Sequence, residues 1–179
     1  MAFAPPFRPT GPQLLESPVV LSVPHAGRDY PPTIEPLLRV PLKALEALED
    51  RHADLLAEQA AADGVSGLVA RIPRAWIDLN RSEREIDPDM VEPPLRGTAL
   101  QQSAKVRGGL GLIPRRLQPH GDLWKGRIAV DSVQARIRDV HQPYHAALAA
   151  LIAQAQMRFG VAVLIDLHSM PPLRDPAGR

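Results

Sequence analysis

The sequence predicts an α/β fold with a mostly parallel or mixed sheet. Three short apolar runs, at residues 17–23, 66–72 and 161–165, have the length and the β-branched and aliphatic content of buried strands. Two longer stretches separate them, at residues 41–62 and 131–159, and their apolar residues recur at helical spacing. Strands that alternate with helices form βαβ units with right-handed crossovers.

Composition limits the classes of function that the chain can have. Its 179 residues are enough for one domain with a sizeable core. Lys and Arg total 21 against 20 for Asp and Glu, so the net charge of +1 provides no electrostatic footprint for nucleic acid or an anionic membrane. Cysteine is absent, which excludes disulfides and thiolate zinc sites. With no signal peptide and no apolar run of ~18 residues, we expect a cytoplasmic protein.

The N-terminal half is expected to contain two or three strands and one helix. Residues 1–16 are Pro-rich and predict an extended or partly disordered arm, ahead of a single α/β domain over residues 17–179. The first strand is followed by a Gly- and Pro-containing loop at residues 25–33. Gly64 is expected to cap the helix that follows. After the second strand, residues 76–79 (WIDL) predict a third, short strand.

The C-terminal half begins with the segment that is hardest to interpret. Residues 81–121 are polar and rich in Pro and Gly, and predict a long loop of the kind that is usually functional or partly disordered. The second helical stretch contains Pro143, which predicts a kink or two successive helices. Gly160 is expected to end it before the last strand.

Three polar clusters directly follow predicted strands. They are residues 22–27 (SVPHAG), 78–81 (DLNR) and 166–169 (DLHS). Because the carboxyl ends of parallel strands meet at one edge of a sheet, we expect His25 and His168 to lie close together. Two imidazoles and a carboxylate, with one position left for water, form a catalytic zinc site, and zinc lowers the pKa of its water to roughly 7.

Each candidate residue also has a structural interpretation. A His beside Pro and Gly, such as His25, is more often a loop residue, and the pair Asn80-Arg81 fits a surface salt bridge as well as a carboxylate clamp. Asp50, His52 and Asp54 fit the exposed face of the first helix.

His141 and His145 are spaced i, i+4 and could chelate a metal from one helix face. The Glu of an H-E-x-x-H motif is missing, and Pro143 lies between them. We therefore interpret both as structural residues or as residues that support the metal ligands from behind.

The order of these segments resembles the N-formylglutamate amidohydrolase family, from about Ser17 to the end of the chain. The matching segments are residues 22–27, the helix around residues 50–54, and residues 77–81, 143–145 and 166–169. Two pieces, residues 78–81 and 168–169, also resemble the substrate-carboxylate motif and the last zinc ligand of zinc carboxypeptidases.

The resemblance implies a three-layer phosphorylase/hydrolase-like fold, one Zn²⁺ and hydrolysis of an amide next to a carboxylate. In the family's type reaction, a step of histidine degradation, N-formyl-L-glutamate and water give L-glutamate and formate. His25 and His168 would ligate zinc, and Asn80, Arg81 and Ser169 would bind the substrate. His168 and Arg81 would be the catalytic residues.

The chain departs from the family pattern at two places. In carboxypeptidase-like sites a Glu follows the first zinc His by three positions, and this chain has Arg28 there. We therefore expect Asp54 as the remaining ligand, with Asp50 and Asp166 as alternatives; Asp166 could instead orient an imidazole. The family's general base is a Glu beyond the DLHS run, and no Glu follows Ser169.

The second departure predicts that the chain corresponds to the N-terminal part of the family domain, with the C-terminal part missing. An unpaired sheet edge would then favour association, so a homo-oligomer is possible.

The leading hypothesis is a zinc-dependent amidohydrolase that acts on a small N-acyl amino acid. The alternatives are a deacylase- or carboxypeptidase-like zinc hydrolase with another substrate, and an inactive homologue that binds metal or ligand. A serine hydrolase that uses Ser169 with His168 is disfavoured, because adjacent residues of an extended segment point to opposite sides.

Overall fold

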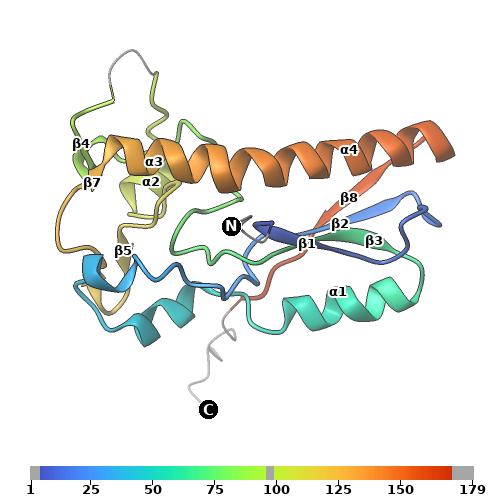
Figure 1. Cartoon of the computed structure of the whole chain (residues 1–179), viewed down its shortest axis with the longest axis horizontal. Coiled ribbons are helices and arrows are strands. Elements are labelled where there is room, and N and C mark those ends of the chain that lie inside the picture. The colour runs from blue at the N-terminus through green and yellow to red at the C-terminus, as the bar shows by residue number, and fades with distance from the viewer. Residues whose placement is uncertain (1–4, 96–98, 171–179) are drawn as a thin grey trace, which may run out of the picture.

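The computed structural model describes residues 5–95 and 99–170. Its central sheet has four strands in the order β1-β3-β2-β8 (Figure 1). β2 pairs in parallel with both β3 and β8, whereas β1 pairs antiparallel with β3. The sheet is therefore mixed, as the sequence predicts. The four strands are β1 (Phe7–Thr10), β2 (Val19–Val23), β3 (Ser66–Ala70) and β8 (Val163–Asp166).

Helices cover both faces of this sheet, with α4 (Gln142–Phe159) on one face and α1 (Ala53–Ala62) on the other (Figure 1). Successive side chains of a strand point to opposite faces. On β2, Val20 packs in the same cluster as Leu148 of α4, and Leu21 packs in the same cluster as Ala57 of α1. The apolar run of β2 is thus buried on both sides. The expected N-terminal arm contributes β1, which extends the sheet beyond β3.

Short elements occupy much of the remaining chain, including the predicted long loop. Pairs β4-β7 and β5-β6 form two small separate sheets. Within the described ranges, no helix is long and apolar enough to span a membrane. The short elements are η1 (Glu35–Leu37), η2 (Leu42–Leu48), η3 (Pro88–Met90), β4 (Val91–Glu92), α2 (Ala104–Arg107), β5 (Arg116–Leu117), β6 (Gly121–Asp122), β7 (Ile128–Ala129), α3 (Val130–Arg136) and the π-helical η4 (Ile137–His141).

The prediction of one helix over residues 41–62 is wrong. The 3-10 helix η2 and the helix α1 are separated by residues 49–52, and His52 has a left-handed φ of 72°. A left-handed residue cannot continue an α-helix. The backbone N–H of Asp50 donates to the carbonyl of His25 at 2.9 Å. This hydrogen bond joins the non-helical residues 49–52 to the loop after β2.

The predicted strand at residues 76–79 is also wrong, because this segment forms turns. Ile77 and Leu79 are buried in the core, which explains the alternating apolar pattern. The backbone N–H of Asp78 donates to the carbonyl of Leu112 at 2.7 Å, rather than to a strand of the central sheet.

The second helical stretch is one continuous run with a π-helical turn in place of a kink (Figure 1). Pro143 has no N–H and cannot donate to the carbonyl four residues earlier. The π turn η4 ends two residues before Pro143 and widens the hydrogen-bond spacing, with the N–H of Gln142 donating to the carbonyl of Ile137. Gly160 ends the helix with a left-handed φ of 72°, as predicted.

The prediction that the last strand is buried is wrong. Val163, Leu164 and Ile165 of β8 are 45%, 47% and 44% exposed. β8 is an edge strand, and among the described residues it pairs with β2 only. Apolar edge strands favour association, so a homo-oligomer stays a prediction that light scattering can test.

Candidate metal centre

Three potential metal ligands meet at the carboxyl ends of β2 and β8. His25 follows β2, Asp50 lies in the break before α1, and His168 follows β8. One ligand atom of each residue lies within 4.8 Å of the other two. The two imidazole ring centroids are 4.8 Å apart. The structure thus brings together two histidines that are far apart in the sequence, at the sheet edge where the parallel strands end.

Both imidazoles present Nδ1 to Asp50 and Nε2 to a second carboxylate. The Asp50 Oδ2 atom is 3.3 Å from Nδ1 of His25 and 2.8 Å from Nδ1 of His168. On the far side, His25 Nε2 is 2.7 Å from Asp78 Oδ1, and His168 Nε2 is 2.8 Å from Asp166 Oδ2. A carboxylate behind an imidazole fixes the ring orientation and leaves the other nitrogen available for a metal.

The carboxylate of Asp78 is the buried anchor of this arrangement. Its side chain is fully buried and accepts hydrogen bonds from Arg74 Nε at 2.9 Å and from the backbone N–H of Asn80 at 2.8 Å. Arg81 Nε lies 3.6 Å away. Burial raises the pKa of Asp78, but its hydrogen bond with His25 and the nearby positive charges outweigh burial and lower the pKa below its ordinary value. Asp78 therefore stays ionised behind His25.

The contacts of Asp50 also hold its carboxylate in the ionised form. Burial alone would raise the pKa of Asp50, but hydrogen bonds with His25 and His168 lower it to about 2. Burial lowers the pKa of His25, and its bonds with Asp50 and Asp78 more than compensate, so the pKa of His25 is raised. An ionised carboxylate oxygen between two imidazole nitrogens is a suitable donor set for a divalent transition metal.

The structure does not bring Asp54, the ligand expected from the sequence, into this cluster. Asp54 lies in the first turn of α1, and its Oδ1 accepts a hydrogen bond from Arg28 Nη2 at 2.9 Å. Asp50 takes the place beside the histidines because the chain breaks before α1. Asp166 contacts Nε2 of His168, the nitrogen that faces away from Asp50. This contact fits the second role considered for Asp166, that of orienting an imidazole.

The predicted substrate-binding residues lie around the same cluster. Asn80 Nδ2 is 3.1 Å from His168 Nε2, and Ser169 Oγ donates to Asp50 Oδ1 at 3.1 Å. Arg81 has a side chain that is 19% exposed, beside Asp78. Asn80 therefore contacts the exposed His168 and Ser169 contacts Asp50, whereas Arg81 lies beside the carboxylate behind His25.

His141 and His145 hold the turn that carries Asn80 and Arg81. His141 Nε2 is 2.8 Å from the carbonyl oxygen of Arg81, and His145 Nε2 is 2.9 Å from that of Leu79. Burial lowers the pKa of His145, and electrostatic repulsion from the neighbouring His141 lowers it further. Both effects favour the neutral form of His145. This geometry agrees with a supporting role for both histidines.

A hydroxyl network that the sequence did not predict supports Asp166. Ser22 Oγ donates to Asp166 Oδ1 at 2.8 Å, and the Tyr144 hydroxyl lies 3.0 Å from Ser22 Oγ. Both hydroxyls occur in the segments that resemble the family, but the polar Ser22 within an apolar strand was the only local signal of this role.

A Gly27→Ala substitution is expected to disturb the centre through the backbone. A Cβ atom at Gly27 would lie 2.2 Å from the carbonyl oxygen of Ile72, and only a backbone shift in the loop after His25 could relieve this overlap. We expect the free energy of unfolding to fall by about 1–3 kcal/mol, as for other overpacked sites, and metal affinity to fall with it. Urea denaturation and a metal titration measure the two effects.

Gly126→Ala is the matched control. A Cβ atom there would meet nothing within 4 Å, so the change in stability should stay within about 0.5 kcal/mol. Equal losses in the two variants would contradict a specific steric role for Gly27.

Comparisons with known proteins agree with the family resemblance of the sequence. Residues 17–178 match the family model described as N-formylglutamate amidohydrolase. An N-formylglutamate deformylase of Pseudomonas aeruginosa is 31% identical over 156 residues, and one of Pseudomonas putida is 28% identical over 155 residues. Each match covers 86% of this chain and 52% of the relative. The chain therefore spans about half the length of these two relatives.

Two solved structures share the fold. The crystal structure of an N-formylglutamate amidohydrolase from Ralstonia eutropha has a TM-score of 0.86 and 36% identity, over 94% of this chain and 59% of that chain. A gene product from Agrobacterium tumefaciens has a TM-score of 0.69 and 17% identity, over 94% of this chain and 58% of that chain. The second similarity concerns the fold alone.

Proposed function

Because the chain belongs to the N-formylglutamate amidohydrolase family, we propose that it hydrolyses N-formyl-L-glutamate or a related N-acyl amino acid with the help of one zinc ion. The observation that carries this proposal is the cluster of His25, Asp50 and His168 at the sheet edge. The names of the relatives support the substrate class, since two of them are N-formylglutamate deformylases.

His25, Asp50 and His168 would hold the zinc ion. Two imidazole nitrogens and one carboxylate oxygen are a donor set of catalytic zinc sites, which keep a further position open. Asp78 and Asp166 contact the outer nitrogens of the two histidines, as supporting carboxylates do at such sites. When bound, zinc supplies Lewis-acid polarisation of the amide carbonyl and activates water at neutral pH.

The surrounding side chains would bind and orient the substrate. The planar guanidinium of Arg81 suits a carboxylate, and the amide of Asn80 adds a hydrogen-bond donor beside it. Ser169 donates its hydroxyl proton to Asp50, and its oxygen can accept a hydrogen bond from the substrate at the same edge. In its proposed catalytic role, the positive charge of Arg81 would stabilise the negative charge that develops on the carbonyl oxygen during attack.

The reaction consumes one water molecule for each substrate molecule. The water oxygen adds to the formyl carbon, the C–N bond breaks, and the amino nitrogen takes up a proton as it leaves. The products are formate and the free amino acid. Two alternatives remain within the proposal: a zinc hydrolase with another acyl or amino-acid preference, and an inactive homologue that binds metal or ligand.

Formate release from N-formyl-L-glutamate, with and without added zinc, tests this proposal. We expect turnover that requires zinc and that His168→Ala lowers by more than about 100-fold, because loss of a ligand should exceed the 10–100-fold cost of losing a supporting residue. His120→Ala, at an exposed histidine, is the control and should keep full activity.

The assay also separates the alternatives. Faster release from another N-acyl amino acid would reassign the substrate. Zinc binding that depends on His168, without any turnover, would support the inactive homologue. Turnover that is unaffected by zinc removal and by His168→Ala would contradict the proposal.

A further inference from the structure

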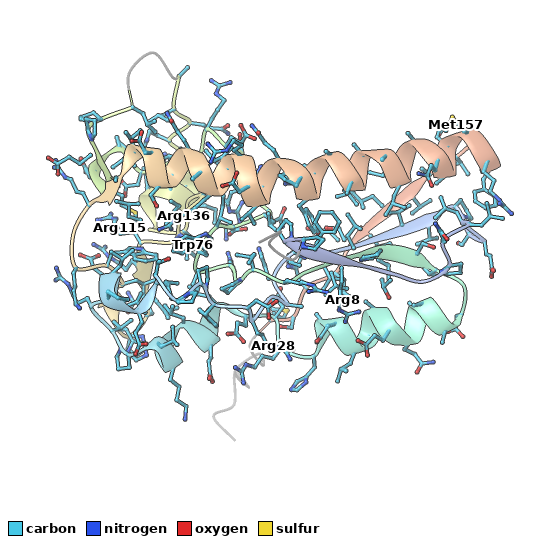
Figure 2. All side chains as sticks on the ribbon, viewed as in Figure 1. Arg8, Arg28, Trp76, Arg115, Arg136 and Met157 are labelled. Carbon is cyan, nitrogen blue, oxygen red and sulfur yellow. The ribbon has the colours of Figure 1, made fainter. Side chains whose placement is uncertain are left out.

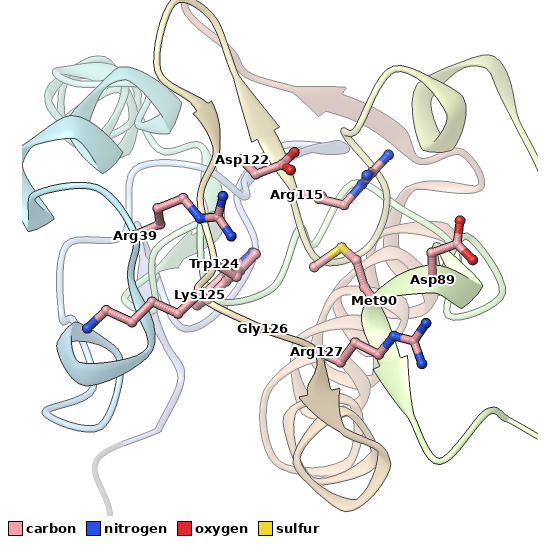
Figure 3. Close-up of a pocket in the computed structure, with 9 residues that line it drawn as sticks. All are labelled: Arg39, Asp89, Met90, Arg115, Asp122, Trp124, Lys125, Gly126 and Arg127. Carbon is pink, nitrogen blue, oxygen red and sulfur yellow. The ribbon is translucent and has the colours of Figure 1, made fainter.

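A cavity of about 210 Å³ next to Trp124 has a cationic lining (Figure 3). Four cationic side chains line it, together with two acidic ones and the buried ring of Trp124. None of these residues belongs to the candidate metal centre. The charged residues are Arg39, Arg115, Lys125 and Arg127, with Asp89 and Asp122.

Backbone hydrogen bonds fix the walls of this cavity. The N–H of Arg39 donates to the carbonyl of Leu123 at 2.8 Å, and the N–H of Leu123 donates to the carbonyl of Arg115 at 2.8 Å. The indole N–H of Trp124 donates to the carbonyl of Pro114 at 2.7 Å. In Figure 3, Arg39 and Arg115 lie on either side of Trp124, and the Arg115 side chain extends away from the indole. The two arginines are thus held by ordered segments.

The cavity carries an excess of positive charge. Arg115 pairs with Asp87 at 2.8 Å, and Asp122 pairs with Arg116 at 3.3 Å. Among the described residues, the other three lining cations form no ion pair with a carboxylate within 4.0 Å, and neither does Asp89 with a cation. Lys125 is one of these three, but its ammonium donates to the carbonyl of Pro36 at 3.0 Å and extends away from the other lining residues in Figure 3. Arg39 and Arg127, with Asp89, therefore leave the cavity a net charge of +1.

A buried arginine adds positive charge behind the cavity. Arg136 is 2% exposed, and its guanidinium carbon lies 3.5 Å from the ring centroid of Trp76 and 5.5 Å from that of Trp124. Figure 2 shows Arg136 and Trp76 together near the α3 end of the long helical run. Nη1 donates to the carbonyl of Trp76, whereas Nε and Nη2 have no hydrogen-bond partner within the described part of the chain.

The charge of Arg136 persists at neutral pH. Burial lowers the pKa of Arg136 to about 9, which still leaves the guanidinium protonated. A buried charge without a counter-ion is costly, and its field is weakly screened. Because Trp124 contacts both the cavity and Arg136, an anion in the cavity would offset this charge as well as the lining cations.

We propose that this cavity is a binding site for a small dianion, either a phosphate group or a compact dicarboxylate. Both ligands present oxygens that arginine forks bind in a bidentate manner, and both match the charge of +2 that the cavity lining and the buried Arg136 carry together. A volume of about 210 Å³ admits either one. The site is separate from Asn80 and Arg81, so it does not depend on the proposed amidohydrolase activity.

Tryptophan fluorescence of the folded chain is a direct probe of this site. The chain has two tryptophans, Trp76 and Trp124, and both contact Arg136. Inorganic phosphate and succinate are titrated separately at constant ionic strength, balanced with sodium chloride. The same titrations are run on Arg39→Gln, Arg127→Gln and the double variant, with Arg138→Gln as the control. Arg138 is exposed and pairs with its neighbour Asp139.

We expect a saturable fluorescence change with at least one of the two anions. The double variant should raise Kd by about tenfold or more, which corresponds to about 1.4 kcal/mol, whereas Arg138→Gln should leave Kd unchanged. A response to phosphate alone or to succinate alone identifies the ligand class. If the double variant does not fold, the single variants decide the question. The proposal is overturned if neither anion gives a saturable change, or if the arginine variants bind as the wild type does.

Discussion

Asp50→Asn is expected to weaken zinc binding by more than about 100-fold, whereas Asp54→Asn leaves it intact. Asp50 Oδ2 lies 2.8 Å from Nδ1 of His168 and 3.3 Å from Nδ1 of His25, so an amide at this position removes the anionic donor that the described residues place between the two imidazoles. Loss of a supporting residue costs 10–100-fold in metal affinity, and loss of the ligand itself should lower affinity by more than about 100-fold.

Asp54→Asn is the matched control, because it makes the same chemical change four residues away. Asp54 pairs with Arg28, and this exposed pair should contribute at most about 1 kcal/mol to stability. Competition between the protein and a fluorescent zinc chelator measures both affinities. If Asp50→Asn binds zinc tightly and Asp54→Asn binds it weakly, then Asp54 and not Asp50 is the zinc ligand.

Asp78→Ala is expected to lower the free energy of unfolding by about 3–5 kcal/mol at neutral pH, as expected when one partner of a buried charge network is removed. The variant leaves His25 Nε2, Arg74 Nε and the backbone N–H of Asn80 without their acceptor at a fully buried position. Zinc affinity should also fall by about 10–100-fold, because Asp78 orients His25.

The pH dependence gives this prediction a second readout. The folded state lowers the pKa of Asp78, so its contribution to stability is fully present above the unfolded value of about 3.9 and is lost as the pH falls through the lower folded value. Urea denaturation of the metal-free chain should therefore show a difference between wild type and Asp78→Ala that shrinks in acid.

Asp139→Ala is the control for Asp78. Asp139 is exposed and pairs with Arg138, so its loss should change stability by no more than about 0.5 kcal/mol. A loss below about 1 kcal/mol in Asp78→Ala would contradict the role of Asp78 as the buried anchor of the site.

Three of the four strands in the central sheet were predictable from sequence because each is a local apolar run, whereas β1 (FRPT) lies in the Pro-rich segment predicted as an arm. Residues 17–23, 66–72 and 161–165 all contain strands of the central sheet. The exposure of β8 was not predictable, because burial depends on what lies across the sheet edge. The alternating pattern at residues 76–79 led to a wrong prediction of a strand. Ile77 and Leu79 are buried in the core from an irregular segment, and alternation alone does not distinguish such a segment from a strand.

The approach of His25 to His168 was also predictable, because it follows from parallel strands and the position of each His after its strand. The placement of Asp50 was not. It depends on the left-handed His52 and on the bond between the Asp50 N–H and the His25 carbonyl, and this tertiary contact overrides a helical pattern. The stack of Arg136 on Trp76 joins residues 60 positions apart, and no local pattern indicates it.

X-ray absorption spectroscopy of the zinc-loaded chain, combined with its zinc content, tests the central claim most directly. We expect one zinc ion per chain, ligated by two imidazole nitrogens and by oxygen at about 2.0–2.2 Å. His25→Ala and His168→Ala should each remove an imidazole from the spectrum. Less than stoichiometric zinc in the wild type, or a spectrum that neither variant changes, would contradict the account.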